Sequence, residues 1–227
     1  MLRILTRAVR RALAEGASVI HRYIVICISD KWNDWCLGVS TSGIVDLSAQ
    51  GVHGPFRGRY AATDYRSFRR IMRHFHIRRG KDVFLDYGSG KGRVVLMAAE
   101  YPFRRIIGIE IAPSLTSIAR ENIRCALPHL VCKDIELVTA DAALFPVPSD
   151  VTFIYGYGTF RGQALEQALN NIWQSLLASP RPLTILWKNA TFFEAEASRH
   201  KWLAKQGERP CPAGHTYVIY TATAGRP

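Results

Sequence analysis

The sequence lacks the cysteine pattern of a secreted or zinc-binding protein. Its five cysteines are odd in number, and no two of them form a Cys-x-x-Cys pair. Neither a disulfide framework nor a metal site is therefore expected, and a reducing, cytoplasmic location is favoured. The chain also lacks a long apolar run, because the stretch 23–28 is far shorter than the roughly 20 residues that a transmembrane helix needs. We therefore predict no transmembrane helix.

Acidic residues are scarce relative to basic ones. Lys and Arg number 30 against 18 Asp and Glu, which gives a net charge of +12 in 227 residues. Such a charge favours association with nucleic acid, acidic proteins or an anionic membrane, without choosing among them. The densest basic patch is a predicted helix over 65–76 and the residues that follow it. No base-stacking aromatic residues are interleaved along that face, so a solvated helix face is favoured over a nucleic-acid site.

Two nucleotide-binding signatures are absent from the glycine-rich stretch at 86–93. No Gly-Lys-Ser/Thr of a P-loop is present, and Arg93 occupies the position where the dinucleotide pattern needs its third glycine. What remains is a short buried strand, then Gly88, Gly90 and Gly92, then helix-forming residues. Glycine lets the chain turn sharply and lets its backbone lie against a ligand. The pattern predicts a nucleotide-binding βαβ unit with N–H groups at a helix N-terminus.

Three acids follow three predicted strands. Asp86 lies two residues before the first glycine, where it would repel a pyrophosphate but could receive the ammonium of an amino acid. Glu110 ends a strand over 105–110, where ribose hydroxyls are held in nucleotide-binding folds. Asp141 ends a strand over 135–141 and could accept from an adenine amino group. Together the acids predict an adenosyl cofactor that carries an amino acid.

From about Tyr60 to its C-terminus the chain resembles the class I S-adenosylmethionine-dependent methyltransferases. The resemblance is most specific at the Asp-x-Gly-Ser-Gly-x-Gly run of 86–92, whose version with Ser89 is similar to that of Dot1-like protein-lysine methyltransferases and many bacterial relatives. It implies that Asp86, Gly88 and Gly90 line the methionine part of S-adenosylmethionine. It also implies that Glu110 holds the ribose and that Asp141 and Ala142 face the adenine.

The segment at the start of this region is similar to one that covers the cofactor in these relatives. Tyr60 and Thr63 match the ends of its Tyr-x-Pro-Thr/Ser pattern, although Ala62 replaces the proline. The expected cofactor-binding residues are then Tyr60, Thr63, Asp86, Gly88, Ser89, Gly90, Gly92, Glu110, Asp141, Ala142 and Tyr155.

The remaining pattern predicts an α/β fold, a doubly wound Rossmann-like seven-stranded sheet with a C-terminal antiparallel hairpin and an N-terminal helical extension. Further strands are expected over 151–155 and 183–187 and in a hairpin of 207–211 with 215–221. Helices are expected over 93–101, 114–127, 163–177 and 192–205. We divide the chain into residues 1–59, an amphipathic helix with a glycine-rich connector from residue 30, and the domain 60–227.

The N-terminal helix has an apolar face with four arginines mostly off it. It can lie on an anionic membrane as a peripheral contact, or it can pack on the domain with solvated arginines, which is the favoured interpretation.

The segment after the fourth strand, 155–160, should face the transferred methyl group, because ligands of open α/β sheets bind at the strands' carboxyl ends. Many relatives carry Asn/Asp-Pro-Pro-Phe/Tyr there, whereas this chain has Gly156-Tyr157-Gly158. Amine methylation is therefore less favoured, although Tyr155, Tyr157 and Phe160 could form an aromatic box around a methylated cation. Tyr155 and Tyr157 are the candidate catalytic residues.

The function that these patterns favour is a methyltransferase acting on an unidentified acceptor, either a protein lysine or a small molecule. A nicotinamide oxidoreductase shares the fold but requires the missing third glycine. The alternative is a catalytically inactive, cofactor-binding regulatory or scaffold subunit, which the altered segment after the fourth strand supports and the three acids oppose.

Overall fold

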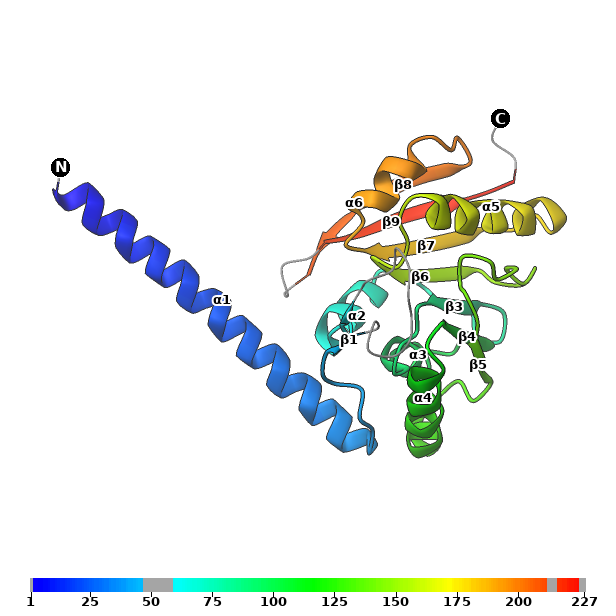
Figure 1. The fold of residues 1–227 in the computed structure, drawn as a ribbon, viewed down its shortest axis with the longest axis horizontal. Coiled ribbons are helices and arrows are strands. Elements are labelled where there is room, and N and C mark those ends of the chain that lie inside the picture. Colours follow the sequence, from blue (N-terminus) through cyan, green and yellow to red (C-terminus); the bar gives the residue numbers. More distant parts are fainter. Residues whose placement is uncertain (1, 47–58, 212–215, 225–227) are drawn as a thin grey trace.

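We describe a computed structural model of the chain, covering residues 2–46, 59–211 and 216–224; for residues 2–15, 17, 18, 59 and 60 it describes the backbone alone. A seven-stranded sheet forms its centre (Figure 1). The strands are β3 (Val83–Tyr87), β4 (Arg105–Glu110), β5 (Ile135–Thr139), β6 (Phe153–Tyr157), β7 (Leu183–Lys188), β8 (Leu203–Pro210) and β9 (Thr216–Ala222). A separate two-stranded ribbon pairs β1 (Val45–Asp46) with β2 (Arg59–Tyr60).

The strand order confirms the predicted fold. The order is β5-β4-β3-β6-β7-β9-β8, in which β3 to β7 run parallel and β9 lies antiparallel to both β7 and β8. The chain passes from β3 to β5 toward one edge and then returns to place β6 on the other side of β3. This reversal creates a switch point at the carboxyl ends of β3 and β6, where open α/β sheets bind ligands.

Helices cover both faces of the sheet and bury its central strands. Residues of α2 (Tyr65–Met72), α3 (Arg93–Ala98) and α4 (Pro113–Ala126), which a short 3-10 turn η2 (Leu127–His129) follows, pack into one core. Residues of α5 (Gln163–Ala178) and α6 (Thr191–Ala197) pack into the other core. All five residues of β3 are buried, as expected for a parallel strand covered on both faces.

Several predicted element bounds differ from the structure; for example, the helices predicted over 65–76 and 93–101 end at Met72 and Ala98, and the strand predicted over 135–141 ends at Thr139. The helix predicted over 192–205 is wrong in its second half, because α6 ends at Ala197 and residues 203–210 form β8. Pairing of β8 with β9, from Leu203 opposite Ala222 to Pro210 opposite Thr216, overrides the local helical preference. The fourth parallel strand also starts two residues later than predicted and extends through Tyr157.

Helix α1 (Leu2–Leu37) continues through part of the predicted connector. The connector was expected to begin at residue 30, because residues 30–59 contain five glycines and Pro55. The helix persists because Asp30 and Asp34 accept hydrogen bonds from the domain, including one from the backbone N–H of Tyr65 and one from its hydroxyl. Figure 1 shows the rest of α1 extending away from the sheet. No helix within the described ranges combines the length and apolarity needed to cross a bilayer.

Candidate active site

The glycine turn after β3 adopts backbone angles that favour glycine. Gly88, Gly90 and Gly92 have φ angles of +78°, +54° and +83°, all in the left-handed region. The backbone N–H groups of Gly88 and Ser89 both donate to the Ile109 carbonyl at 2.9 Å. The turn therefore lies against the carboxyl end of β4, as the sequence pattern predicts.

Glu110 at the end of β4 holds this turn in place. Its Oε2 accepts from the Gly90 N–H at 2.8 Å, and its Oε1 accepts from the Ala112 N–H at 2.9 Å. Burial raises the pKa of Glu110, and these N–H groups oppose that shift. Glu110 is buried because its carboxylate bonds the backbone of the turn. Each carboxylate oxygen retains a lone pair that a ribose hydroxyl can use.

Asp86 on the neighbouring strand β3 has a different environment. It is 2% exposed, and its Oδ2 has no hydrogen-bond partner within the described residues. Burial raises the pKa of Asp86 well above its ordinary value, and the nearby Glu110 carboxylate raises it further. A buried carboxylate without a partner is costly, and a bound cation would compensate it. The site therefore fits the ammonium group of an amino acid.

The third acid completes a row along the strand ends. Asp141 is half-buried, and its Oδ1 accepts from the Ala143 N–H at 2.9 Å, while Ala142 is buried beside it. Since β5, β4 and β3 are consecutive neighbours about 4.8 Å apart, the three acids span about 10 Å. This length suits one extended adenosyl ligand.

The predicted covering segment contacts β6 beside Asp86. The Thr63 Oγ1 and the Tyr155 hydroxyl lie 2.6 Å apart, both buried, and Tyr155 is the strand partner of Asp86. Burial raises the pKa of Tyr155 well above its ordinary value, so the hydroxyl keeps its proton, which is the opposite of what a general base needs. Tyr60 lies in β2 opposite Val45, and its side chain is outside the described residues.

The expected aromatic box is not assembled. Tyr155 and Phe160 pack into different cores, on opposite faces of the sheet. The ring of Phe160 contacts Tyr87, with centroids 5.2 Å apart, and Trp187, with centroids 5.9 Å apart. Side chains alternate between faces along a strand, and the loop after β6 carries Phe160 to the other side.

Lys188 is a site residue that the sequence analysis missed. Its ammonium lies 4.6 Å from the centroid of the Tyr157 ring and 3.6 Å from Oδ2 of Asp64, the N-cap of α2. The side chain is 2% exposed, and burial lowers the pKa of Lys188, which the Asp64 carboxylate opposes. Lys188 is a charged residue at the end of the apolar strand β7, which runs parallel to the strand that contains Asp86. This pattern is the sequence signal that could have identified Lys188.

Arg93, directly after the glycine turn, is a second missed residue. Its guanidinium is buried and donates to Asp30 Oδ2 at 2.6 Å, Thr41 Oγ1 at 2.6 Å and Ser42 Oγ at 2.7 Å. Asp34 accepts from the backbone and hydroxyl groups of both Thr41 and Ser42. We call the Asp30, Asp34, Thr41, Ser42 and Arg93 network the arginine clamp. It fixes the end of α1 and the following loop to the start of α3.

Comparisons with known proteins agree with this geometry. A family model described as "Methyltransferase domain" matches residues 84–178, which include the glycine turn and all three acids. A Drosophila melanogaster enzyme named histone-lysine N-methyltransferase, H3 lysine-79 specific, is 34% identical over 76 residues, which are 33% of this chain and 4% of that enzyme. The chain thus spans only a small fraction of that curated relative.

Solved structures show the same fold. An RNA methyltransferase from Salinibacter ruber in complex with S-adenosyl-L-homocysteine superposes with a TM-score of 0.56 at 20% identity, covering 74% of this chain and 97% of that one. A SAM-dependent methyltransferase from Aquifex aeolicus gives 0.53 at 12% identity, covering 69% and 89%. The family match covers residues 84–178, and with the strand order and the glycine turn these likenesses show that the chain has the fold of the class I S-adenosylmethionine-dependent methyltransferases.

Proposed function

We propose that this protein transfers a methyl group from S-adenosylmethionine to a small-molecule acceptor held at the carboxyl ends of β6 and β7. S-adenosylmethionine, the cofactor of this family, supplies a methyl group activated on a positive sulfonium. The unpartnered, buried carboxylate of Asp86 beside the glycine turn carries the proposal. The ammonium group of this cofactor would be the positively charged partner that the Asp86 carboxylate lacks, and the sulfonium adds a second positive charge.

Each strand end then has a role in holding the cofactor. Asp86 would accept from the ammonium, and the remaining lone pairs of Glu110 would accept from the ribose hydroxyls. Asp141 would accept from the adenine amino group, with Ala142 against the ring. Thr63, bonded to Tyr155, holds the covering segment next to Asp86. These contacts place the donor in one orientation, and orientation supplies much of the acceleration in an in-line displacement.

The position of Lys188 favours an acceptor that is not a protonated amine. Its ammonium already occupies the face of the Tyr157 ring, where a methylated cation would otherwise bind. It also pairs with Asp64, so Asp64 is not a free carboxylate that could receive a protonated amine. The carboxyl ends of β6 and β7 therefore suit a small acceptor with an oxygen nucleophile better than a lysine.

A protein lysine is the second candidate acceptor. The similarity to the fly histone-lysine methyltransferase favours it, over 76 residues at 34% identity. Lysine methylation requires the acceptor amine to lose its proton before attack, so a base would be needed there. The two candidates differ in which fraction of a cell extract accepts methyl groups.

The test uses S-adenosylmethionine with a labelled methyl group and a cell extract separated into protein, nucleic acid and small metabolites. We expect label in the small-metabolite fraction, and much less with Asp86→Asn. Label in the protein fraction that remains on lysine after hydrolysis would show that the acceptor is a protein lysine and not a small molecule. No label in any fraction, with S-adenosylhomocysteine still bound, would overturn methyl transfer and support the inactive scaffold.

We also propose that α1 makes a peripheral contact with an anionic membrane. Its described part exposes seven large apolar side chains, each about half or more: Val19, Ile20, Tyr23, Ile24, Ile28, Trp32 and Trp35. The sequence supplies four arginines nearer the N-terminus that would complement anionic lipid. Wild type should sediment with phosphatidylglycerol vesicles but not with phosphatidylcholine vesicles. If the double variant Ile20→Asp, Ile24→Asp sediments with phosphatidylglycerol vesicles as fully as wild type does, the result would contradict this contact.

A further inference from the structure

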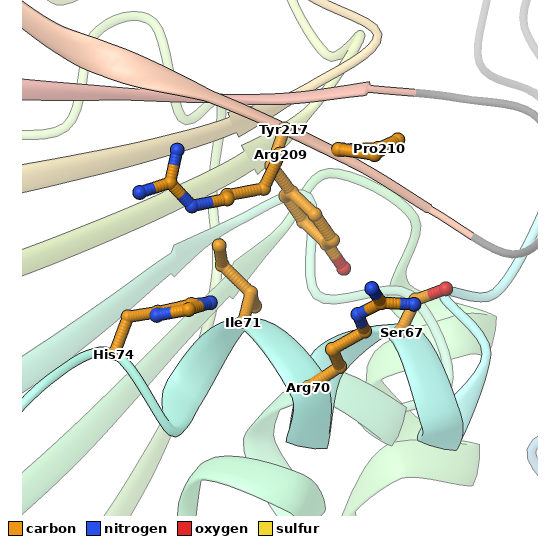
Figure 2. Close-up of a pocket in the computed structure, with 7 residues that line it drawn as sticks. All are labelled: Ser67, Arg70, Ile71, His74, Arg209, Pro210 and Tyr217. Carbon is orange, nitrogen blue, oxygen red and sulfur yellow. The ribbon is translucent and has the colours of Figure 1, made fainter.

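A hollow of about 180 Å³ lies between α2 and the β8–β9 hairpin, outside the row of acids (Figure 2). We propose that this hollow binds a phosphate or carboxylate group of a small-molecule methyl acceptor. The inference rests on the proposed function, since it names the chemical class of that function's acceptor. Four observations carry it: the position of the hollow, its charge, its buried hydroxyl groups and its apolar wall.

The hollow lies beside the edge of the sheet where methyl transfer is proposed. Because β9 runs antiparallel to β7, Tyr217 at its start lies opposite Lys188 at the end of β7. The rings of Tyr217 and Tyr155 have centroids 6.2 Å apart, and Tyr155 is the strand partner of Asp86. The inner wall of the hollow therefore adjoins the strands that would face the transferred methyl group.

Basic side chains from both sides surround the hollow. Arg70 comes from α2, His74 from the turn that follows α2, and Arg209 from β8. Arg70 makes no hydrogen bond or ion pair with any residue that the structure describes, whereas the adjacent Arg69 is bound to Glu100. Arg209 donates from Nη1 to the Glu208 carbonyl and keeps its other N–H groups available. Two guanidinium forks around a small volume match the planar, paired oxygens of a carboxylate or phosphate.

Two residues that line the hollow carry buried hydroxyl groups. Among the described parts of the chain, the Ser67 Oγ neighbours the Cys211 thiol and the Tyr217 hydroxyl neighbours the Tyr155 hydroxyl, and neither contact has the geometry of a full hydrogen bond. Figure 2 shows the Tyr217 ring reaching from β9 toward α2, with its hydroxyl on the side of Ser67 and Arg70. Buried polar groups are nearly always well bonded, so these two hydroxyls retain hydrogen-bonding capacity that a small shift of either side chain would offer to a ligand. As donors, both can bond an anion.

The local negative charge is already compensated. Asp64, three residues before Ser67, accepts from the Ser67 N–H through Oδ1 and pairs with the Lys188 ammonium through Oδ2. Lys188 in turn lies 5.9 Å from the centroid of the Tyr217 ring. Thus an anion in the hollow would meet Arg70 and Arg209 directly, with the Asp64 carboxylate neutralised by Lys188.

The remaining wall is apolar and limits the size of the ligand. Ile71 and Pro210 line the hollow between the charged groups. A volume of about 180 Å³ admits one anionic group and a small aromatic or aliphatic body. The chemistry therefore points to a small organic phosphate or carboxylate rather than to a polyanion.

The experiment titrates full-length protein with phenyl phosphate and, separately, benzoate at constant ionic strength, with and without S-adenosylhomocysteine. We expect saturable binding of at least one probe to wild type, and the probe that binds tells phosphate from carboxylate. Arg70→Gln and Arg209→Gln should each weaken that binding about ten-fold or more, since each removes charged hydrogen bonds. Arg73→Gln is the matched control, because Arg73 is exposed next to the same helix and does not line the hollow.

The outcomes separate this site from the proposed function. No probe binding, or equal weakening by Arg73→Gln, would overturn the anion site while S-adenosylhomocysteine binding and methyl transfer stay measurable. Probe binding that depends on Arg70 and Arg209, in a protein that transfers no methyl group, would support the site and defeat the proposed function. Tighter binding of an RNA oligonucleotide than of either probe, lost with the same two arginines, would overturn the small-molecule assignment.

Discussion

At the scale of single residues, Asp86 and Glu110 lie near the ends of neighbouring parallel strands but differ in their hydrogen-bond partners. Glu110 accepts from two backbone N–H groups of the turn, whereas one oxygen of Asp86 is unpartnered. The pKa of Asp86 is raised above its unfolded value, so ionisation of this group opposes folding. The protonated Asp86 carboxyl therefore contributes fully to stability at pH values below its pKa in the unfolded chain. This contribution is lost as the pH rises through its pKa in the folded protein.

Asp86→Asn should therefore stabilise the ligand-free protein while weakening cofactor binding. Near neutral pH we expect the free energy of unfolding to rise by about 1 kcal/mol or more, because no buried charge remains. Affinity for S-adenosylhomocysteine should fall about ten- to a hundred-fold through loss of a charged hydrogen bond. Urea unfolding at pH 5 and pH 8, with calorimetric titration, measures both effects. A destabilised variant that binds normally would mean that Asp86 is a structural acid.

Glu110→Ala should have the opposite effect on stability. It leaves the buried N–H groups of Gly90 and Ala112 without acceptors, so we expect the free energy of unfolding to fall by about 1–3 kcal/mol. Affinity for adenosine should fall together with affinity for the whole cofactor, since Glu110 would bind the ribose. Glu110→Gln, which keeps one acceptor oxygen, is the graded control. If wild type, Glu110→Ala and Glu110→Gln have the same free energy of unfolding in urea titrations, the turn does not depend on this carboxylate.

At the scale of elements, the arginine clamp joins the end of α1 to the glycine turn. Its arginine is buried, and breaking a buried pair by removing one partner leaves an uncompensated charge on Asp30 and Asp34. Arg93→Gln should therefore lower the free energy of unfolding by about 3 kcal/mol and expose residues 38–46 to limited proteolysis. Cleavage by the same protease at the same rate as in wild type would contradict the clamp.

Truncation of residues 2–15 is the matched control for that clamp. The described contacts of α1 with the domain begin well after this segment, at Ile26 and Asp30. Affinity for S-adenosylhomocysteine should then stay within about two-fold of wild type, well below the effect of one lost charged hydrogen bond. Loss of cofactor binding in a folded truncated protein would give the N-terminal turns of α1 a role in covering the site.

At the scale of the whole molecule, cofactor binding should appear as thermal stabilisation. A ligand that binds only the folded state stabilises it by about 2.7 kcal/mol at a hundred times its Kd. For a protein of this size, that corresponds to a rise in Tm of about 5–10 °C. S-adenosylhomocysteine should produce this shift and NAD at equal concentration should not, because Arg93 replaces the third glycine of the dinucleotide pattern. A shift with NAD alone would contradict the site as described.

The sequence by itself determined the fold and the row of acids. Apolar strands ending in Asp86, Glu110 and Asp141, with glycines at every second position after the first, are local patterns. Each depends on a few neighbouring residues, because burial on both faces of a parallel sheet and positive φ angles leave few alternatives. The five parallel strands, the hairpin and the glycine turn could therefore be predicted before any contact was known.

Only the tertiary structure decided what lies around that row. In the sequence, nothing distinguishes Arg93 from other polar residues. In the structure it is bound by Asp30 and Thr41, which lie more than fifty positions away in the chain. Lys188 and Asp64 form a pair across 124 positions, which also changes the charge expected at the acceptor edge. Residues 203–206, most of which were predicted to be helical, extend β8 because β9 offers an open edge. In each case the energy comes from partners distant in the chain, and local propensity carries no information about them.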